Sequence, residues 1–251
     1  MHKILANTGF LGKDLQILTD CHSTNESAVS RLRSGKAKEG TVILTHNQTQ
    51  GRGQRGNRWH SKPGMNLTFS MVFKPDFLSV DRQFLLNMAI ALGVQKALCR
   101  LVSGINIKWP NDFLSAEGKK IGGMLVENTL SGNRIVASVV GIGVNVNQHE
   151  FSVPEATSLA NLSGKAYSLD QLLEILLVSV EDYYLKLKSG EQEIIQKEYL
   201  SQLYRFGTWA SYEDDEVFTG KIVDVGIHGR LIITKQNGTI ASYDLKQIRF
   251  I

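Results

Sequence analysis

The sequence predicts a mixed α/β domain followed by a small all-β domain. Strand-like and helix-like segments alternate along most of the chain, which is typical of a mixed α/β fold. From Trp209 onward only short β-rich pieces remain, separated by turn signals such as Asn237-Gly238. We therefore expect one domain over residues 1–204 and a second over residues 205–251.

Composition and charge argue against several classes of protein. A chain of 251 residues with 42% hydrophobic content can bury a substantial core, and its formal charge of +4 is mild. Generic nucleic-acid binding needs a clustered basic face, so it is not expected. Cys21 and Cys99 lie far apart, which indicates neither a disulfide scaffold nor a zinc site. No apolar run approaches the length of about 20 residues that crosses a bilayer, so we expect a cytoplasmic protein without membrane contact.

The individual elements follow from the spacing of apolar residues. Helices are predicted at 26–33, 84–101, 169–188 and 191–203. Strands of the first domain are predicted at 41–46, 66–73, 105–109, 120–127 and 134–145, and the last two of these form a hairpin. Strands of the second domain are predicted at 216–219, 221–225, 230–234 and 239–245. So small a β domain has a marginal core of its own, so we expect it to dock on the first domain.

Residues 51–56, Gly-Arg-Gly-Gln-Arg-Gly, match the G-x-G-x-x-G fingerprint of dinucleotide-binding proteins letter for letter. In that motif a helix begins at the glycines. Here Pro63-Gly64 marks a turn instead, and residues 66–73 predict another strand. The order strand, loop, strand therefore excludes a dinucleotide-binding fold.

The same loop is a candidate anion-binding loop because it holds Arg52, Arg55, Arg58 and Trp59. Guanidinium groups pair bidentately with phosphate or carboxylate, and glycines let a ligand approach the backbone amides. An indole can also stack on a base. The alternative interpretation is a solvated basic hairpin loop. Arginines inside a glycine frame, next to an aromatic residue, favour a nucleotide-like ligand.

Three further polar clusters are candidates for the same site. Ser23-Thr24-Asn25 precedes a helix, where its side chains either cap the helix or face a ligand. Lys108-Trp-Pro-Asn-Asp112 and Lys120-Ile-Gly-Gly123 are either ordinary turn and strand-edge residues or the cation and carboxylate of a nucleotidyl transfer site. Gly141-Ile-Gly-Val-Asn145 is either a buried strand or a place where an amide meets a base edge. The histidines lack metal-ligand spacing, so no fixed metal site is expected.

Taken together, these motifs resemble the biotin–protein ligases, the enzymes that biotinylate carboxylase subunits. The motifs that occur in the family's order are Ser23-Thr24-Asn25, Gln48, Gly51-Arg-Gly-x-Arg-Gly56 with Trp59, Lys108-Trp-Pro-Asn-Asp112, Lys120-Ile-Gly-Gly123 and Gly141-Ile-Gly-x-Asn145. The resemblance spans essentially the whole chain. It implies a class II synthetase-like α/β catalytic domain with a mixed sheet, followed by an SH3-like β-barrel.

The resemblance also implies the reaction and its participants. Biotin would attack the α-phosphate of ATP through its carboxylate, giving biotinyl-5′-AMP and pyrophosphate. A lysine of a biotin carboxyl carrier protein or domain would then take the biotin and release AMP. Mg²⁺ would arrive with ATP rather than occupy a fixed protein site.

A role for each matching residue is implied as well. Biotin would be bound by Ser23, Thr24, Asn25, Gln48, Gly51, Arg52, Gly53, Gln54, Lys120 and Gly123. ATP or the adenylate would be bound by Arg52, Arg55, Trp59, Lys108, Asn111, Asp112, Lys120, Asn145 and Arg249. Lys120, Arg52 and Asp112 would be catalytic, with Lys120 stabilising charge as the anhydride forms.

The sequence departs from the family pattern in two places. Gln54 stands where well-studied bacterial relatives carry arginine, and Asn57 stands where another basic residue is common. Gln54 keeps hydrogen-bonding capacity but loses a charge in a loop that helps those relatives retain the adenylate. Ligation is expected to survive because Arg52 and Arg55 remain. The chain also opens almost directly into the catalytic domain, without the winged-helix domain of repressor-type members, so no DNA operator binding is expected.

Two alternative functions stay open. A lipoate or octanoate ligase or transferase shares the architecture, although Lys108-Trp-Pro-Asn-Asp112 together with the arginine–glycine loop favours biotin. A non-enzymatic nucleotide- or RNA-binding module would use the basic loop as its contact and would bind nucleic acid in a salt-sensitive way. A homodimer formed through the main sheet is a further hypothesis. The acidic run 213–216 is interpreted as a solvated turn.

Overall fold

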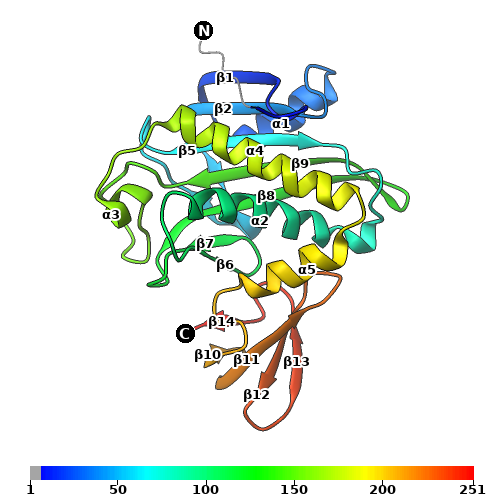
Figure 1. The fold of residues 1–251 in the computed structure, drawn as a ribbon, viewed down its shortest axis with the longest axis vertical. Helices are drawn as coiled ribbons and strands as arrows, with labels where there is room; N and C mark the ends of the chain where they lie inside the picture. Colours follow the sequence, from blue (N-terminus) through cyan, green and yellow to red (C-terminus); the bar gives the residue numbers. More distant parts are fainter. Residues whose placement is uncertain (1–6) are drawn as a thin grey trace.

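The structure, a computed structural model, describes residues 7–251 and is built around a seven-stranded sheet (Figure 1). In sheet order the strands are β1 (Asp14–Cys21), β2 (Thr41–Gln48), β5 (Leu67–Phe73), β9 (Arg134–Val144), β8 (Lys120–Ser131), β7 (Asp112–Leu114) and β6 (Asn106–Lys108). The pair β1–β2 is parallel and the other neighbouring pairs are antiparallel. The sheet is therefore mixed, as the sequence predicts.

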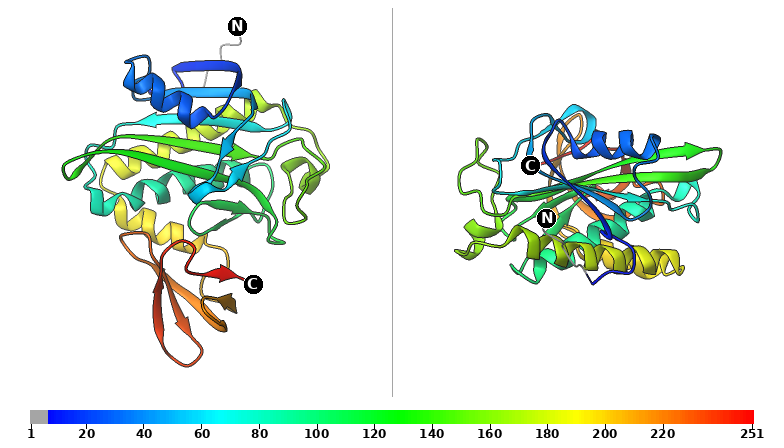
Figure 2. Two further views of the ribbon diagram at one scale, coloured as in Figure 1. Left: turned by 180° about the vertical axis from the view of Figure 1, so that it is seen from behind. Right: turned by 90° about the horizontal axis from the view of Figure 1, so that it is seen from above.

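Helices lie on both faces of this sheet, as the two views in Figure 2 show. On one face α2 (Phe84–Cys99) packs against α4 (Leu169–Lys188) and α5 (Gln192–Ser201). Because α2 is buried between these elements, it is apolar on nearly all sides. On the other face α1 (Thr24–Arg33) places Ala28 over a smaller cluster with Ile43 and Val139. Within the described residues, no helix has the length and apolar character that a membrane span requires.

Most elements predicted from the spacing of apolar residues are confirmed, with shifts of a few residues at their ends. Helix α4 coincides with its predicted range, and β8 and β9 form the predicted hairpin. The patterns do not predict β1, nor the short β7 and α3 (Leu159–Ser163). β1 is an edge strand whose residues are all at least partly exposed, with Ile17 at 42% exposure. Such a strand carries little of the apolar signal on which the prediction depends.

The connection between β2 and β5 contains no α-helix, which confirms that the fingerprint at residues 51–56 is not a dinucleotide-binding motif. It holds two short antiparallel strands, β3 (Gly51–Arg52) and β4 (Arg58–Trp59), on either side of a 3-10 turn at Gln54–Gly56. We call residues 51–59 the arginine loop.

The C-terminal residues form a five-stranded antiparallel sheet. Its strands are β10 (Trp209–Glu213), β11 (Val217–Val225), β12 (Leu231–Lys235), β13 (Ile240–Tyr243) and β14 (Arg249–Phe250), in the order β13-β12-β11-β10-β14. The separate strands predicted at 216–219 and 221–225 are one strand, so that prediction is wrong. Gly220 lies inside this strand, at a position where a side chain would collide with Ile233. The hairpin turn predicted at Asn237-Gly238 is confirmed, with φ +86° at Gly238.

The acidic run 213–216 is more than a solvated turn, which corrects the prediction. Glu213 pairs with Arg249, and Asp214 Oδ2 accepts hydrogen bonds from Lys235 Nζ at 2.9 Å and from the Tyr243 hydroxyl at 2.7 Å. The hydrogen bond from Lys235 is the largest cause of the lowered pKa of Asp214. These carboxylates connect neighbouring strands of the small sheet.

The small sheet docks on the main domain through Trp109, which is 6% exposed. The indole Nε1–H donates to the carbonyl oxygen of Gly229 at 2.8 Å. Gly229 adopts φ +82° and lies against the ring of Phe84, where no other residue would fit. Buried residues of both sheets belong to one apolar cluster. The docking predicted from the small size of this domain is thus confirmed, while the boundary at residues 204 and 205 stays a prediction.

We expect Trp109→Phe to lower the free energy of unfolding by about 1–3 kcal/mol, because it leaves the buried carbonyl of Gly229 without a donor. Trp209→Phe is the matched control. Trp209 is 52% exposed, so its replacement should change stability by less than about 0.5 kcal/mol. Urea unfolding of the three proteins measures both effects, and equal midpoints would contradict the assigned role of the Trp109 bond.

Candidate active site

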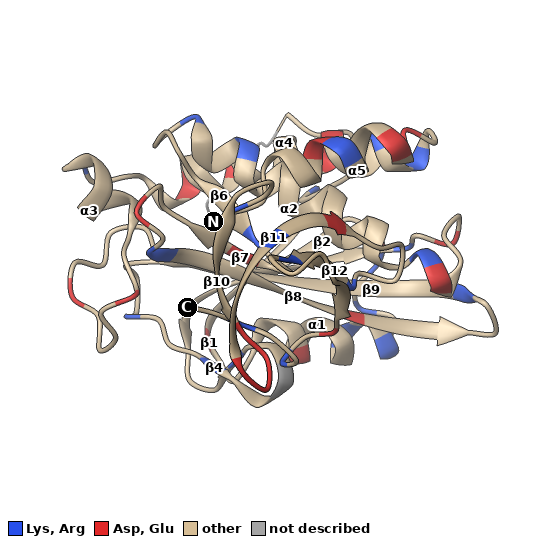
Figure 3. Ribbon diagram, turned by 90° about the horizontal axis from the view of Figure 1, so that it is seen from below, with Lys and Arg blue, Asp and Glu red and all other residues tan. Residues whose placement is uncertain are grey.

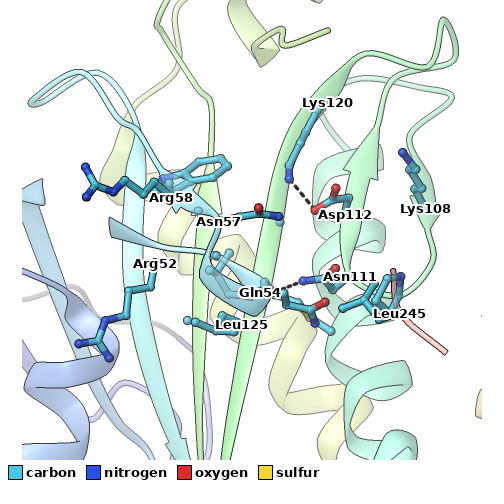
Figure 4. A pocket seen from close by; sticks show the side chains of 18 of the residues that line it. Arg52, Gln54, Asn57, Arg58, Lys108, Asn111, Asp112, Lys120, Leu125 and Leu245 are labelled. Atoms are coloured by element: carbon cyan, nitrogen blue, oxygen red, sulfur yellow. Dashed lines mark hydrogen bonds and ion pairs between the residues drawn. The ribbon is translucent and has the colours of Figure 1, made fainter. Parts of the chain in front are cut away.

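One cavity of about 310 Å³ lies between the main sheet, the arginine loop and residues 245–250 of the small domain. Figure 4 shows Gln54 of the arginine loop there, together with Asn111 and Asp112 at the start of β7. The predicted site residues that line it are Ser23, Thr24, Asn25, Gln48, Arg52, Gly53, Gln54, Trp59, Lys108, Asn111, Asp112, Lys120, Gly123 and Arg249. The structure therefore brings together segments that are far apart in the sequence.

The uncharged end of the cavity is formed by the start of α1 and the end of β2. Ser23 holds the N-cap position but makes no capping hydrogen bond through its side chain. The backbone N–H of Thr24 donates to Gln48 Oε1 at 2.9 Å, so the oxygen of that amide is already engaged. Gly51 does not line the cavity. It lies where a side chain would collide with Gln48 Nε2 and with the carbonyl of Trp59.

Behind this end, Thr24 and Asn25 belong to a hydrogen-bonded network with residues that the sequence motifs do not include. Asn25 contacts Glu127 Oε2 at 2.7 Å and Ser70 Oγ at 2.6 Å, and Ser70 Oγ lies 2.7 Å from Thr24 Oγ1. Ser70 and Thr68 lie on β5, and Thr68 lines the cavity with a buried hydroxyl that has no partner. Their signal in the sequence is the presence of hydroxyl residues inside the apolar run 67–73, where buried polar groups need hydrogen bonds.

Two glycines of β9 make room for the residues that face the cavity. A side chain at Gly141 would collide with Asn25, and one at Gly143 would collide with the indole of Trp59. The interpretation of this segment as a strand containing glycines is confirmed for residues 141–144. Asn145 does not line the cavity. Its side chain donates to the carbonyl of Thr157 at 3.0 Å, and it is 4% exposed.

The arginine loop lies over the cavity with its side chains in two directions. Gln54 points into the cavity, where its Oε1 is buried without a partner, whereas Arg52 and Arg58 point away from it (Figure 4). Arg52 pairs with Glu26 of α1 at 3.3 Å, and both side chains are about half exposed. The side chain of Arg55 lies outside the described part of the structure.

The charged end of the cavity contains Lys120 and Asp112, whose Nζ and Oδ1 atoms lie 2.7 Å apart. Gly123 lies beside this pair, where a side chain would come too close to the Asp112 carboxylate. The Lys120 N–H donates to Glu155 O, and Lys120 O accepts from the Thr157 N–H at 2.8 Å. The backbone of Lys120 is thus fixed while its side chain remains accessible to a ligand.

Lys108 and Arg249 flank this pair. Burial lowers the pKa of Lys108, and nearby Lys120 adds to this effect, while Asp112 opposes it. The ammonium group of Lys108 lies 5.1 Å from the centre of the Phe250 ring. Arg249 lines the cavity and pairs with Glu213. Next to Asp112, the side-chain amide of Asn111 donates to the carbonyl of Met124.

The donor set of the cavity suits an anion better than a protein-bound metal. Among the described residues that line it, Asp112 is the only carboxylate. No group of three or more His, Cys, Asp or Glu side chains in residues 7–251 is arranged to hold a metal ion. A magnesium ion bound to a triphosphate needs only one or two protein carboxylates, so Asp112 fits an ion that arrives with its nucleotide.

Comparison with known proteins agrees with this arrangement. The sequence model of the Biotin/lipoate A/B protein ligase family matches residues 19–145. The bifunctional ligase/repressor BirA of Bacillus spizizenii is 31% identical over 242 residues, which cover 92% of this chain and 72% of that protein. The biotin–[acetyl-CoA-carboxylase] ligase of Mycobacterium tuberculosis is 28% identical over 198 residues, which cover 76% of this chain and 71% of that protein.

Solved structures give the same result. The biotin protein ligase of Aquifex aeolicus in complex with biotin and ATP superposes with a TM-score of 0.78 and 28% sequence identity. The match covers 95% of this chain and 100% of that chain, so it includes both sheets. The sequence, the fold and the cavity lead to one conclusion: the chain belongs to the Biotin/lipoate A/B protein ligase family and, within it, to the biotin protein ligases.

Proposed function

We propose that the described cavity carries out both steps of biotin–protein ligation. The chain activates biotin as biotinyl-5′-AMP and transfers it to a carboxyl carrier protein. The observation that carries this assignment is the Lys120–Asp112 pair, which lies at the charged end of a cavity whose other end offers neutral hydrogen-bonding groups. Biotin has a carboxylate at one end and a neutral ureido ring at the other, so the two ends match.

In the first step, biotin lies with its ureido ring against Thr24 and Gln48 and its carboxylate toward Lys120. An oxygen of that carboxylate attacks the α-phosphorus of ATP, and the bond to pyrophosphate breaks. The ammonium group of Lys120 leaves Asp112 and contacts the carboxylate of biotin and the α-phosphate oxygens of ATP. Its positive charge stabilises the transition state. Holding the two anions together also offsets their mutual repulsion.

The arginine loop and the small domain contribute further cations. The Arg52–Glu26 pair is exposed and therefore weak, so Arg52 can leave Glu26 for the adenylate. We assign Lys108 and Arg249, which also line the cavity, to contacts with the phosphates of ATP. Trp59 provides a flat surface for adenine. If Mg²⁺ enters bound to the triphosphate, Asp112 would be the lining carboxylate, among the described residues, that could hold it.

In the second step, the amine of the acceptor lysine attacks the acyl carbon of biotinyl-5′-AMP. The bond between that carbon and the phosphate oxygen breaks, AMP leaves, and the new amide nitrogen loses a proton to solvent. Asp112 is the one carboxylate among the described lining residues, which supports a role for it in orienting the incoming amino group. We also propose a cytoplasmic location, where ATP and the carrier protein are available.

The two alternative functions receive less support from the cavity. Neither lipoate nor octanoate has a polar group that would match Thr24 and Gln48 at the uncharged end. A nucleic-acid-binding module would need a clustered basic face. Acidic and basic residues lie interspersed along α4 and α5 (Figure 3), so these two helices do not provide such a face.

The central test of the proposed function is Lys120→Ala. We expect a roughly 100- to 1000-fold loss in the rate of adenylate formation, because the charge that stabilises the transition state is removed. Lys119→Ala is the matched control, since Lys119 is the adjacent lysine, is exposed and does not line the cavity. The readout is the intact mass of a carrier domain incubated with Mg-ATP and biotin, or with lipoate. Unchanged biotinylation in Lys120→Ala would overturn the assigned role, and no mass gain with the wild-type chain would overturn the function.

A pH profile tests Lys108. Its lowered pKa means that the ammonium form, which attracts phosphate, is lost at a lower pH than in an ordinary lysine. We expect kcat/KM for ATP to fall as the pH rises through this pKa, since this constant reports groups of the free enzyme. Lys108→Arg should remove the fall, because arginine stays protonated. A profile that is the same in both proteins would show that another group is responsible.

We further propose that two copies of the chain pair through the main sheet. β1 is an edge strand with one paired side among the described strands, and an open edge can accept a strand from a second copy. We expect sedimentation velocity to detect a dimer when biotin and ATP are present. Ile17→Lys, on the exposed part of β1, should weaken the dimer. A monomer at all concentrations, with and without ligands, would refute this proposal.

A further inference from the structure

The network behind the uncharged end of the cavity can be assigned proton by proton. Asn25 Nδ2 lies 2.7 Å from Glu127 Oε2 and 3.3 Å from the carbonyl oxygen of Leu125, and both of these oxygens accept. The other amide atom of Asn25, Oδ1, is therefore the one that faces Ser70 Oγ at 2.6 Å. Because Oδ1 can only accept, the single hydroxyl proton of Ser70 lies in this bond.

The same reasoning shows which partner receives the hydroxyl proton of Thr24. Its Oγ1 lies 2.7 Å from Ser70 Oγ and 3.3 Å from Gln48 Oε1. Ser70 has no second proton, so the shorter contact requires that Thr24 donates to Ser70. Gln48 Oε1 then accepts only from the Thr24 backbone N–H at 2.9 Å. The Nε2 group of Gln48 is left as the donor that this side chain can offer to a ligand.

We propose that Ser70 is a positioning residue that determines which acid the cavity accepts. It is fully buried and does not line the cavity, so it acts through Thr24. By taking the Thr24 proton, it leaves the Thr24 hydroxyl with lone pairs only to offer to a ligand. The cavity then presents an acceptor at Thr24 next to a donor at Gln48.

This pattern selects for a ureido group, which carries an N–H donor beside a carbonyl acceptor. The dithiolane ring of lipoate and the alkyl end of octanoate carry neither, so they leave Thr24 and Gln48 without partners in a desolvated site. Discrimination against such a ligand is strong because buried polar groups left unpaired are costly. The inference deepens the proposed function and rests on it.

Ser70→Ala tests the inference. Without the Ser70 hydroxyl, Thr24 can donate its proton to Gln48 Oε1 instead. The arrangement of an acceptor at Thr24 beside a donor at Gln48 is then no longer fixed. We expect KM for biotin to rise roughly tenfold, about 1.4 kcal/mol, with KM for ATP and kcat changed by less than about twofold. Pyrophosphate release measures all three constants. Calorimetric titration with biotin alone gives Kd without requiring turnover.

Ser138→Ala is the matched control. Ser138 is also fully buried in the main sheet, its hydroxyl lies 2.6 Å from Asn128 Oδ1, and it does not line the cavity. Both variants should lose similar thermal stability, whereas only Ser70→Ala should weaken biotin binding. Ser70→Cys provides a second variant at the site. Its thiol is a weaker donor, so we expect an intermediate KM for biotin.

A double-mutant cycle separates positioning from a general structural effect. Thr24→Val removes the hydroxyl through which Ser70 acts, so adding Ser70→Ala should raise KM for biotin by less than about twofold further. Independent, multiplying effects would overturn the inference, as would an equal loss of biotin affinity in Ser138→Ala. If the wild-type chain forms no biotinyl-5′-AMP, the proposed function itself fails, and this outcome differs from normal adenylate formation with no effect of Ser70→Ala.

Discussion

The site depends on two glycines of β9, which have no side chain. Gly141 and Gly143 leave hollows in the middle of the sheet, and these hold Asn25 from the start of α1 and Trp59 from the arginine loop. Both segments are distant from β9 in sequence, and each is positioned by close contact with its backbone. Any larger residue at either position would displace one wall of the cavity. The glycines therefore set how the helix and the loop are placed relative to each other.

The cavity has two ends that differ in chemistry, one with neutral hydrogen-bonding groups and one with charged groups. At one end, the polar groups near Thr24 are held by hydrogen bonds that begin in the sheet, at Ser70 and Glu127. At the other end, Lys120 is fixed through its backbone and satisfied by Asp112 through its side chain. A charge held this way needs little reorganisation when an anionic ligand replaces its partner.

The sequence predicts the parts of this structure that local patterns determine. Helix 169–188 follows from its apolar spacing, and the hairpin of β8 and β9 from two apolar runs. Many of the cavity residues follow from the ordered motifs in which they occur. The hydrogen-bond partners of Ser70, the contact of Asn145 with Thr157 and the bonds of Asp214 could not be found in this way. Each depends on partners from distant segments, and no local pattern records which residues the fold brings together.

The bond between Trp109 and Gly229 has a consequence for the fate of the reaction intermediate. Trp109 lines the cavity and also anchors the small sheet, and residues 245–250 of that sheet form one wall. A separation of the two sheets would open the charged end to solvent. A mixed anhydride exposed to water is lost by hydrolysis. We therefore expect the yield of the transfer to depend on how stably the two sheets are docked, with the small domain protecting a short-lived intermediate from water.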